Sequence, residues 1–336
     1  MSDTRPRTRL RRTGLYAVAD AEPAHGHETR PSIEDVAALG DRLGANLRRG
    51  VHLSASVLDI VLTTLLAGGH LLVEDYPGVG KTQLARTLAG SLATGFSRVQ
   101  ATVDLLPSDI VGTNIWRAES RAFEFLAGPV FAHVVLVDEL NRATPKTQSG
   151  LLEAMQEQQV TVDGESLPLP LPFVVIATQN PSAGYDGTYP LPAAQLDRFL
   201  ARVSLGYPAP EQELALLSEG PVSVSSVTTP AELLAAQRAA AGIHTSRPLL
   251  RYLVELLLAT RRHPLVEVGA SPRAGLMLLA AARAHAAIAG RDFVVPDDVQ
   301  AMADAVLRHR LLLAATAATS DAEKVVADVV GQVQAR

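Results

Sequence analysis

Residues 70–82 read His70-Leu-Leu-Val-Glu-Asp-Tyr-Pro-Gly-Val-Gly-Lys-Thr82, and this stretch decides the fold. A short apolar run leads into a loop with two glycines, and a helical pattern follows over residues 82–94. Small residues at Gly78 and Gly80 let backbone N–H groups converge on phosphate oxygens, and the N-terminus of the next helix adds its positive dipole end. This order of strand, loop and helix predicts a phosphate-binding loop.

The side chains of this loop suit a nucleoside triphosphate. Lys81 can reach the β- and γ-phosphates, and the Thr82 hydroxyl can hold Mg²⁺. The residues that we expect around the nucleotide are Asp75, Tyr76, Pro77, Gly78, Val79, Gly80, Lys81, Thr82 and Gln83.

The loop departs from the pattern G-x-x-x-x-G-K-[ST] at its first position, where Asp75 stands in place of glycine. Aspartate adopts unusual turn geometry more readily than most residues, so the loop can keep its shape. The alternative is a glycine-rich turn with an incidental lysine. We prefer the phosphate loop because the chain has only three lysines among 30 basic residues, at positions 81, 146 and 324.

Five short apolar runs alternate with helical patterns along the first part of the chain. The runs are His70–Glu74, Ser97–Ala101, His133–Asp138, Phe173–Thr178 and Leu200–Leu205. Apolar runs that alternate with helices indicate a parallel sheet covered by helices on both faces. We therefore predict an α/β core over residues 31–206, preceded by a tail over residues 1–30 that lacks an apolar period.

The remaining residues, 207–336, carry apolar side chains at helical spacing. The predicted helices are Pro208–Glu219, Pro230–Gly242, Pro248–Thr260, Pro272–Ala289 and Asp297–Ala315. A second, α-helical domain is the natural conclusion.

Two carboxylates follow the apolar run that starts at His133. A buried strand delivers Asp138 to the sheet edge beside the phosphate loop, where it can bind Mg²⁺ together with Thr82. Glu139 can orient or deprotonate a water for attack on the γ-phosphate. The alternative, a strand that ends in solvated acids, is disfavoured by the phosphate loop about 50 residues upstream.

Three further polar residues are candidates for the same site. Asn180 follows another apolar run and can hydrogen-bond the attacking water or the γ-phosphate, although Asn before proline is also a turn signal. Arg198 lies in Leu196-Asp-Arg-Phe199, which is unremarkable by itself. Arg273 lies in the first turn of a helix, where a cation opposes the helix dipole; this favours an anionic partner over a plain surface arginine.

Taken together, these motifs resemble the MoxR branch of the AAA+ ATPases. The order of phosphate loop, Asp-Glu strand, Thr-Gln-Asn-Pro, Leu-Asp-Arg-Phe and Ser-Pro-Arg is that of the AAA+ class. Further stretches match the MoxR branch: Asp104–Thr113, Phe125–Phe131, Asp138–Ser149, Gly269–Arg273 and Gly290–Val299. The resemblance covers about residues 35–315.

The resemblance implies an AAA+ core with a helical lid that hydrolyses ATP with Mg²⁺. Lys81 and Thr82 would form the Walker A pair, and Asp138 and Glu139 the Walker B pair. Asn180 would be sensor 1. Arg198 would be the arginine finger acting on the neighbouring subunit's ATP. Arg273 would be sensor 2, closing the lid on the γ-phosphate. The catalytic set that it implies is therefore Lys81, Glu139, Asn180, Arg198 and Arg273.

The same resemblance implies an assembly and partners. Residues 113–126 and 159–170 would form two hairpins facing the pore of a homo-oligomeric ring, with a hexamer expected. Chaperone-like remodelling, maturation or metal insertion of client proteins would be the function, with a partner that carries a von Willebrand factor A domain. Arg142 and Lys146 lie inside the family signature, and Arg142 suits a subunit interface. The segment Gly50-Val-His-Leu53 departs from the family's adenine-side pattern.

Composition narrows the remaining classes. The chain is 47% hydrophobic and 19% charged, with no Cys and a net charge of −5, which excludes a disulfide scaffold and a Cys nucleophile. No run reaches the roughly 18 apolar residues of a membrane span. The basic start lacks the apolar run of a secretory signal. We expect a cytoplasmic protein.

Two other functions are open from the sequence. An AAA+ nucleic-acid motor or transcriptional regulator is favoured by the Arg-rich tail. The acidic body and the lack of a basic aromatic stripe argue against nucleic-acid binding. A metabolic phosphate-loop kinase is disfavoured by the pair Asp138 and Glu139 and by the helical domain that carries Arg273.

Overall fold

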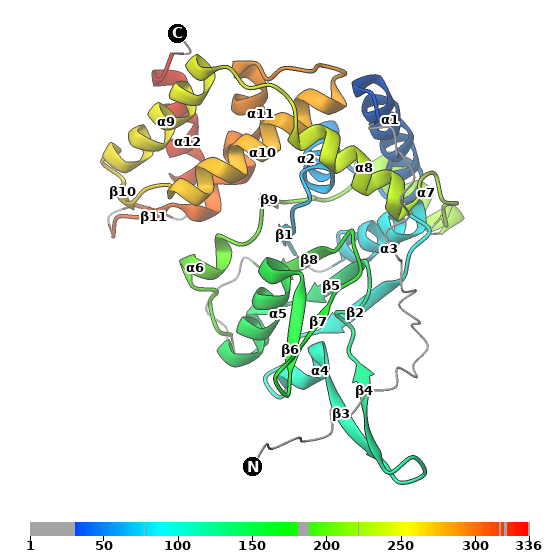
Figure 1. Ribbon diagram of the computed structural model, residues 1–336. Coiled ribbons are helices and arrows are strands. Elements are labelled where there is room, and N and C mark those ends of the chain that lie inside the picture. Colours follow the sequence, from blue (N-terminus) through cyan, green and yellow to red (C-terminus); the bar gives the residue numbers. More distant parts are fainter. Residues whose placement is uncertain are drawn as a thin grey trace, which may run out of the picture.

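A five-stranded parallel sheet forms the centre of the molecule (Figure 1). The structure, a computed structural model, describes residues 31–76, 78–180, 188–220, 222–315, 317–318 and 321–334. The strands in spatial order are β2 (Phe96–Gln100), β5 (Val134–Asp138), β8 (Val174–Gln179), β1 (Leu71–Glu74) and β9 (Ala201–Val203). The predicted α/β core with a parallel sheet is confirmed.

Helices cover both faces of this sheet because its strands are apolar on both sides. Val134 and Leu136 of β5 join one hydrophobic cluster, and the alternate residues Val135 and Val137 join the other. The first cluster holds α1 (Ile33–Gly50), α2 (Ala55–Leu66) and α3 (Lys81–Ser91). The second holds α4 (Pro107–Val111), the 3-10 turn η1 (Leu140–Arg142) and α5 (Pro145–Glu157).

The carboxyl ends of β1, β5 and β8 meet at one edge of the sheet. Glu74 pairs with Gln179 across β1 and β8, and Gln100 pairs with Asp138 across β2 and β5. The loops that follow these strands therefore lie together, as is usual for ligand sites in parallel α/β sheets.

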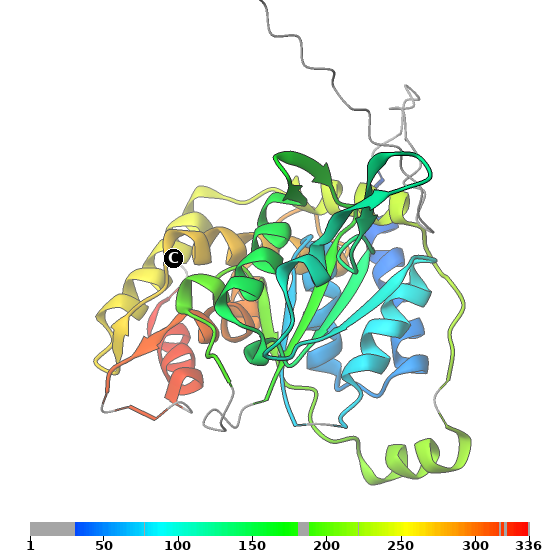
Figure 2. The ribbon, with the colours of Figure 1, turned by 90° about the horizontal axis from the view of Figure 1, so that it is seen from below.

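Two β-hairpins extend from the sheet on the same side of the molecule (Figure 2). One pairs β3 (Gly112–Arg117) with β4 (Ala122–Ala127), and the other pairs β6 (Gln159–Val162) with β7 (Glu165–Pro168). Asn114 of the first donates a hydrogen bond of 2.7 Å to Asp163 of the second. Hairpins predicted over 113–126 and 159–170 are thus confirmed.

The rest of the chain is mainly helical. After the short helix α6 (Ala193–Leu196), the helices are α7 (Pro210–Glu219), α8 (Pro230–Ala241), α9 (Arg247–Arg262), α10 (Pro272–Ile288), α11 (Pro296–Leu307) and α12 (Asp321–Gln332). A small antiparallel pair joins β10 (Val266–Val268) to β11 (Leu312–Leu313). Among the helices that the structure describes, none has the length and apolar character needed to cross a membrane.

The single helix predicted over Asp297–Ala315 is wrong at its C-terminal end. Helix α11 ends at Leu307, a 3-10 turn η2 (Arg308–Arg310) follows, and the chain then enters β11. The physical reason is that His309 and Arg310 are buried and bond to backbone carbonyls near the end of α6, including Phe199. These contacts hold residues 308–310 in the 3-10 turn and thereby stabilise the end of α11.

The N-terminal helices α1 and α2 pack against α10, and α8 packs against both of them. One hydrophobic cluster therefore runs from a sheet face into the helical part. The boundary predicted near residue 207 falls between β9 and α7, and it remains a prediction.

Candidate nucleotide-binding site

A cavity of about 370 Å³ lies at the sheet edge where β1, β5 and β8 end. It is lined by Asp75, Gly78, Gly80, Lys81, Thr82, Gln83, Arg86, Arg98, Gln100, Asp138, Glu139, Thr178 and Asn180. Three acidic residues and several cationic and amide side chains face one space. Such a cavity suits a polyphosphate and a divalent cation better than an apolar ligand.

The phosphate loop takes its shape from two glycines with left-handed backbone. Gly78 has φ +89° and Gly80 has φ +93°, and Gly80 is the N-cap of α3. An L side chain would be strained at either position, although a Cβ at Gly78 would meet no atom within 4 Å. The loop thus brings the N-terminal end of α3, with Lys81 and Thr82, to the cavity.

The Lys81 ammonium is held within the loop and donates a hydrogen bond of 2.8 Å to the carbonyl oxygen of Asp75. Burial lowers the pKa of Lys81, and the nearby charges of Asp75, Asp138 and Glu139 oppose that shift. The ammonium therefore lies near three carboxylates in the cavity lining, where it can bind a phosphate chain.

The Asp138 carboxylate is oriented by two neighbours. Arg98 of β2 donates from Nε to Asp138 Oδ2 at 2.7 Å, and the Thr178 hydroxyl donates to Oδ1 at 3.3 Å. Asp138 itself is buried. The carboxylate of Asp138 and the hydroxyl of Thr82 line one cavity and offer the oxygen donors that Mg²⁺ prefers, so these residues fit that ion.

Glu139 follows β5 in a strained backbone conformation, with φ +55°. Its N–H donates to the Thr178 hydroxyl at 2.9 Å, which fixes the turn. Arg142 Nη1 donates to Glu139 Oε2 at 3.0 Å, and Gln100 donates to the same oxygen at 3.5 Å. The side chain of Glu139 thus has a defined position at the cavity wall.

Most of the predicted phosphate-loop and strand-end residues are brought together at this cavity. Nine of them line it: Asp75, Gly78, Gly80, Lys81, Thr82, Gln83, Asp138, Glu139 and Asn180. Tyr76 and Val79 are not among the lining residues; Tyr76 is exposed, and Val79 is buried in the hydrophobic core. Pro77 lies outside the described residues.

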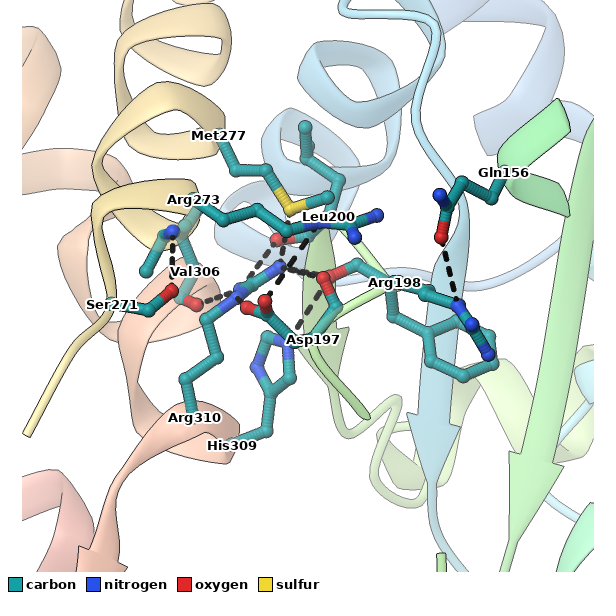
Figure 3. A network of polar contacts seen from close by, with 12 residues as sticks. Gln156, Asp197, Arg198, Leu200, Ser271, Arg273, Met277, Val306, His309 and Arg310 are labelled. Atoms are coloured by element: carbon teal, nitrogen blue, oxygen red, sulfur yellow. Dashed lines mark hydrogen bonds and ion pairs between the residues drawn. The ribbon is translucent and has the colours of Figure 1, made fainter. Parts of the chain in front are cut away.

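Arg198 and Arg273 lie elsewhere, at the contact between α6 and the helical part (Figure 3). Arg273 Nε is 3.8 Å from Asp197 Oδ2, and Arg198 Nε donates to Gln156 Oε1 of α5 at 3.2 Å. Neither arginine lines the cavity. The expected finger Arg198 and the expected sensor 2 residue Arg273 therefore both lie outside the lining of this cavity.

A third arginine, Arg310, anchors the same region. It is buried, and its Nε lies 2.8 Å from Asp197 Oδ1 (Figure 3). It also donates to the backbone carbonyls of Phe199, Leu200 and Val306. Burial lowers the pKa of Arg310 to about 10, with the hydrogen bond to Asp197 opposing the shift.

Four cavity residues were not predicted from the sequence: Arg86, Arg98, Gln100 and Thr178. Arg98 and Gln100 are two residues apart on β2, so they share a face of that strand. Arg86 lies four residues after Thr82, one helical turn along α3. This spacing is the sequence signal that could have predicted Arg86, Arg98 and Gln100 as cavity residues.

The fold and this cavity define a nucleotide-binding domain of the AAA class. The model of the family described as "ATPase family associated with various cellular activities (AAA)" matches residues 70–201, and that of the AAA lid domain matches residues 258–329. A crystal structure of a candidate ATPase from Cytophaga hutchinsonii superposes with a TM-score of 0.81 at 34% identity, covering 90% of this chain and 97% of that one. A likeness to an MCM homologue from Methanopyrus kandleri, at 19% identity and a TM-score of 0.58, concerns the fold alone.

Similar sequences narrow the class. Chaperone MoxR1 of Mycobacterium tuberculosis is 43% identical over 269 residues, which is 76% of this chain and 71% of that one. Protein MoxR of Paracoccus denitrificans is 34% identical over 77% of this chain and 84% of its own. Uncharacterized protein YeaC of Bacillus subtilis is 44% identical over 83% and 89%. The chain belongs to the MoxR family of AAA+ ATPases.

Proposed function

We propose that the protein hydrolyses ATP to ADP and phosphate in the cavity at the sheet edge. One observation carries this proposal: Lys81, Thr82, Asp138, Glu139 and Asn180 come from three separate segments and line one space. No single segment requires this meeting, because each could end in a solvated loop. Phosphoryl transfer to water requires the same set of groups.

The roles of the side chains follow from their positions. The backbone N–H groups at the start of α3 and the Lys81 ammonium bind the phosphate chain. Thr82 and Asp138 would hold Mg²⁺, which neutralises charge on the phosphate oxygens when bound. Arg98 and Thr178 keep the Asp138 carboxylate in place for that purpose.

Glu139 is the proposed base. A water attacks the γ-phosphorus, its proton passes to the Glu139 carboxylate, and the bond between the γ-phosphorus and the β–γ bridging oxygen breaks. Arg142 and Gln100 orient the carboxylate, and Asn180 is placed at the same cavity to hydrogen-bond the water or the γ-phosphate.

Arg198 and Arg273 serve a second subunit in this proposal. Both lie outside the lining of their own cavity. Arg198 directly follows Asp197 in the turn after α6, and Arg273 of α10 lies 3.8 Å from the Asp197 carboxylate. A ring of copies, with a hexamer expected, would bring these cations to the ATP of the adjacent subunit, where they stabilise transition-state charge. Arg273 would then reach a γ-phosphate across the interface.

Remodelling of client proteins is the proposed use of this ATP hydrolysis. One relative, at 43% identity, is named a chaperone. The β3–β4 hairpin carries Trp116 and Phe123, which are 56% and 55% exposed and pack edge to face. Exposed aromatic side chains on a projecting hairpin suit contact with another protein chain. A partner with a von Willebrand factor A domain, and metal insertion as a task, come from the family resemblance alone.

The hydrolysis proposal is tested by phosphate release from purified protein. Lys81→Ala is expected to lose nucleotide binding, whereas Glu139→Gln is expected to bind ATP and lose turnover by about 100-fold or more, the usual effect of removing a general base. Normal turnover in both variants would refute the site. The Glu139→Gln variant, which holds ATP, is also the trap with which client and partner proteins can be captured.

A further inference from the structure

Asp75, the residue that departs from the phosphate-loop pattern, makes an unusual set of contacts. Its Oδ2 atom accepts hydrogen bonds from the Leu205 N–H at 2.7 Å, the Gly206 N–H at 2.9 Å and the Ser204 hydroxyl at 3.1 Å. Its Oδ1 atom accepts from the Tyr76 N–H at 2.9 Å. The residue is 5% exposed. A buried carboxylate with four donors is a well-satisfied anion.

These donors lie at the start of the connection, the segment that leads from β9 through α7 toward the helical part. Residues 204–206 follow β9 directly and precede α7, which lies away from the rest of the chain (Figure 2). Gly206 has φ +70°, a backbone conformation that favours glycine, so the connection turns where Asp75 holds it. The first residue of the phosphate loop thus holds the start of the connection.

A second contact holds the chain after α7, at Val222. The Gln83 amide donates to the Val222 carbonyl at 3.1 Å and to the Gly50 carbonyl at 3.0 Å. Gln83 comes one residue after Thr82, near the N-terminus of α3. Both ends of the excursion that carries α7 therefore bond to residues that line the nucleotide cavity.

Asp75 is also bonded to the lysine of the loop. Its carbonyl oxygen accepts from Lys81 Nζ at 2.8 Å, while its carboxylate holds residues 204–206. A phosphate chain in the cavity competes with that carbonyl for the ammonium. One residue therefore contacts both the group that meets phosphate and the chain that leads to the helical part.

Phosphate binding alone does not explain why aspartate, and not glycine, stands at position 75. Glycine at position 75 would complete the G-x-x-x-x-G-K-[ST] pattern and would remove a negative charge from the vicinity of a polyphosphate. It would also leave the N–H groups of Leu205 and Gly206 without this acceptor. The aspartate thus adds a connection that phosphate binding alone does not need.

We propose that Asp75 is a positioning residue that couples the phosphate loop to the connection at residues 204–206, so that nucleotide binding restrains this connection. The inference rests on the proposed nucleotide binding and extends it to communication between the site and the helical part. Residues 204–206 can open only when their hydrogen bonds to the Asp75 carboxylate break, and the loss of these bonds disturbs the phosphate loop. A nucleotide that stabilises the closed loop therefore opposes this opening.

Amide hydrogen exchange of the full chain, with and without ADP and Mg²⁺, tests the coupling. Ligand at about 100 times its Kd slows an opening that excludes the ligand by up to roughly 100-fold. We expect the Leu205 and Gly206 amides of the wild type to slow by at least about tenfold. The Val227 amide, which bonds to the Ser91 carbonyl instead, provides an internal reference.

Asp75→Asn and Asp75→Gly separate the coupling from binding. The Kd of each variant for a fluorescent ADP analogue is measured first, and each exchange experiment uses ADP at about 100 times the variant's own Kd. Under this matched saturation, the ADP-dependent slowing at residues 205 and 206 is expected to fall below about twofold in both variants. Asp35→Asn is the matched control, because Asp35 accepts a backbone hydrogen bond in an exposed cap of α1 far from the cavity. It should keep the wild-type response. Ser204→Ala removes one donor only and should give an intermediate response, which keeps the test available if either Asp75 variant fails to fold.

Two results would overturn different claims. An unchanged ADP-dependent slowing in Asp75→Asn or Asp75→Gly, with binding retained, would refute the coupling and leave the proposed function intact. Absence of ADP binding by the wild type would instead refute the proposed function.

Discussion

Two arginines, Arg310 and Arg273, reach the carboxylate of Asp197. We expect removal of Arg310 to lower the free energy of unfolding and removal of Arg273 to lower ATP turnover. Arg310 is 7% exposed and bonds to the Asp197 carboxylate at 2.8 Å, and it also donates to four backbone carbonyls. Arg310→Ala would remove the buried partner of Asp197 and a donor to each of those carbonyls. Breaking a buried pair by removing one partner costs about 3–5 kcal/mol of unfolding free energy.

Arg273 has a different environment. Its side chain is 41% exposed, and its Nε lies 3.8 Å from Asp197 Oδ2. An exposed pair at this distance contributes about 0–1 kcal/mol, so Arg273→Ala should leave the unfolding free energy nearly unchanged. If Arg273 serves the nucleotide of an adjacent subunit, the same variant should lower ATP turnover by about tenfold or more.

Urea unfolding and phosphate release, measured on both variants, give the comparison. We expect Arg310→Ala to shift the unfolding midpoint strongly and Arg273→Ala to shift turnover alone. If Arg273→Ala destabilised the chain as much as Arg310→Ala, Arg273 would be an anchor of the helical part, and its proposed role at a nucleotide would be refuted. Full turnover in Arg273→Ala would refute that role as well.

Two further predictions concern stability. Hydrogen bonds with Asp298 and Asp59 raise the pKa of His285 to about 9, against the effect of burial. Because the protonated imidazole is favoured in the folded chain, these bonds contribute fully to the free energy of unfolding below pH about 6.5, and the contribution is lost as the pH rises to about 9. Urea unfolding should show a loss of up to about 3 kcal/mol over this window. His285→Gln should show a much flatter profile, and an equal slope in both proteins would contradict the assignment. Gly50→Ala should cost about 1–3 kcal/mol, because its Cβ would lie 2.5 Å from the Thr87 side chain, and a wild-type melting temperature would contradict this packing.

The sheet was predictable because its strands are short, apolar and separated by helices. The run from Val134 to Val137 predicts a strand buried on both faces, because it is short and rich in β-branched residues, and the structure buries all four residues. The parallel arrangement then determines which strand ends meet. The loop and strand-end residues of the cavity followed from this arrangement, as Lys81, Asp138 and Asn180 show, whereas Arg86, Arg98, Gln100 and Thr178 did not.

Contacts between distant segments were not predictable. Nothing in the sequence near Arg310 indicates that it reaches Asp197, which is 113 residues away, or that α11 ends at Leu307. The partner of Asp75 was likewise hidden, because its acceptor role depends on where β9 ends. Local patterns determine elements, but the bonds between elements depend on how they pack.

The proposed ATP hydrolysis depends most directly on whether neighbouring copies complete one another's sites. Arg198→Ala and Glu139→Gln subunits should each be inactive alone, because one lacks the cation for its neighbour and the other lacks its own base. Mixed in varied ratios, they should regain ATP turnover, since an Arg198→Ala subunit keeps Glu139 and can receive Arg198 from a Glu139→Gln neighbour. Recovery with a maximum at an intermediate ratio is the predicted result. Absence of recovery at every ratio, from rings shown to contain both subunits, would contradict the account.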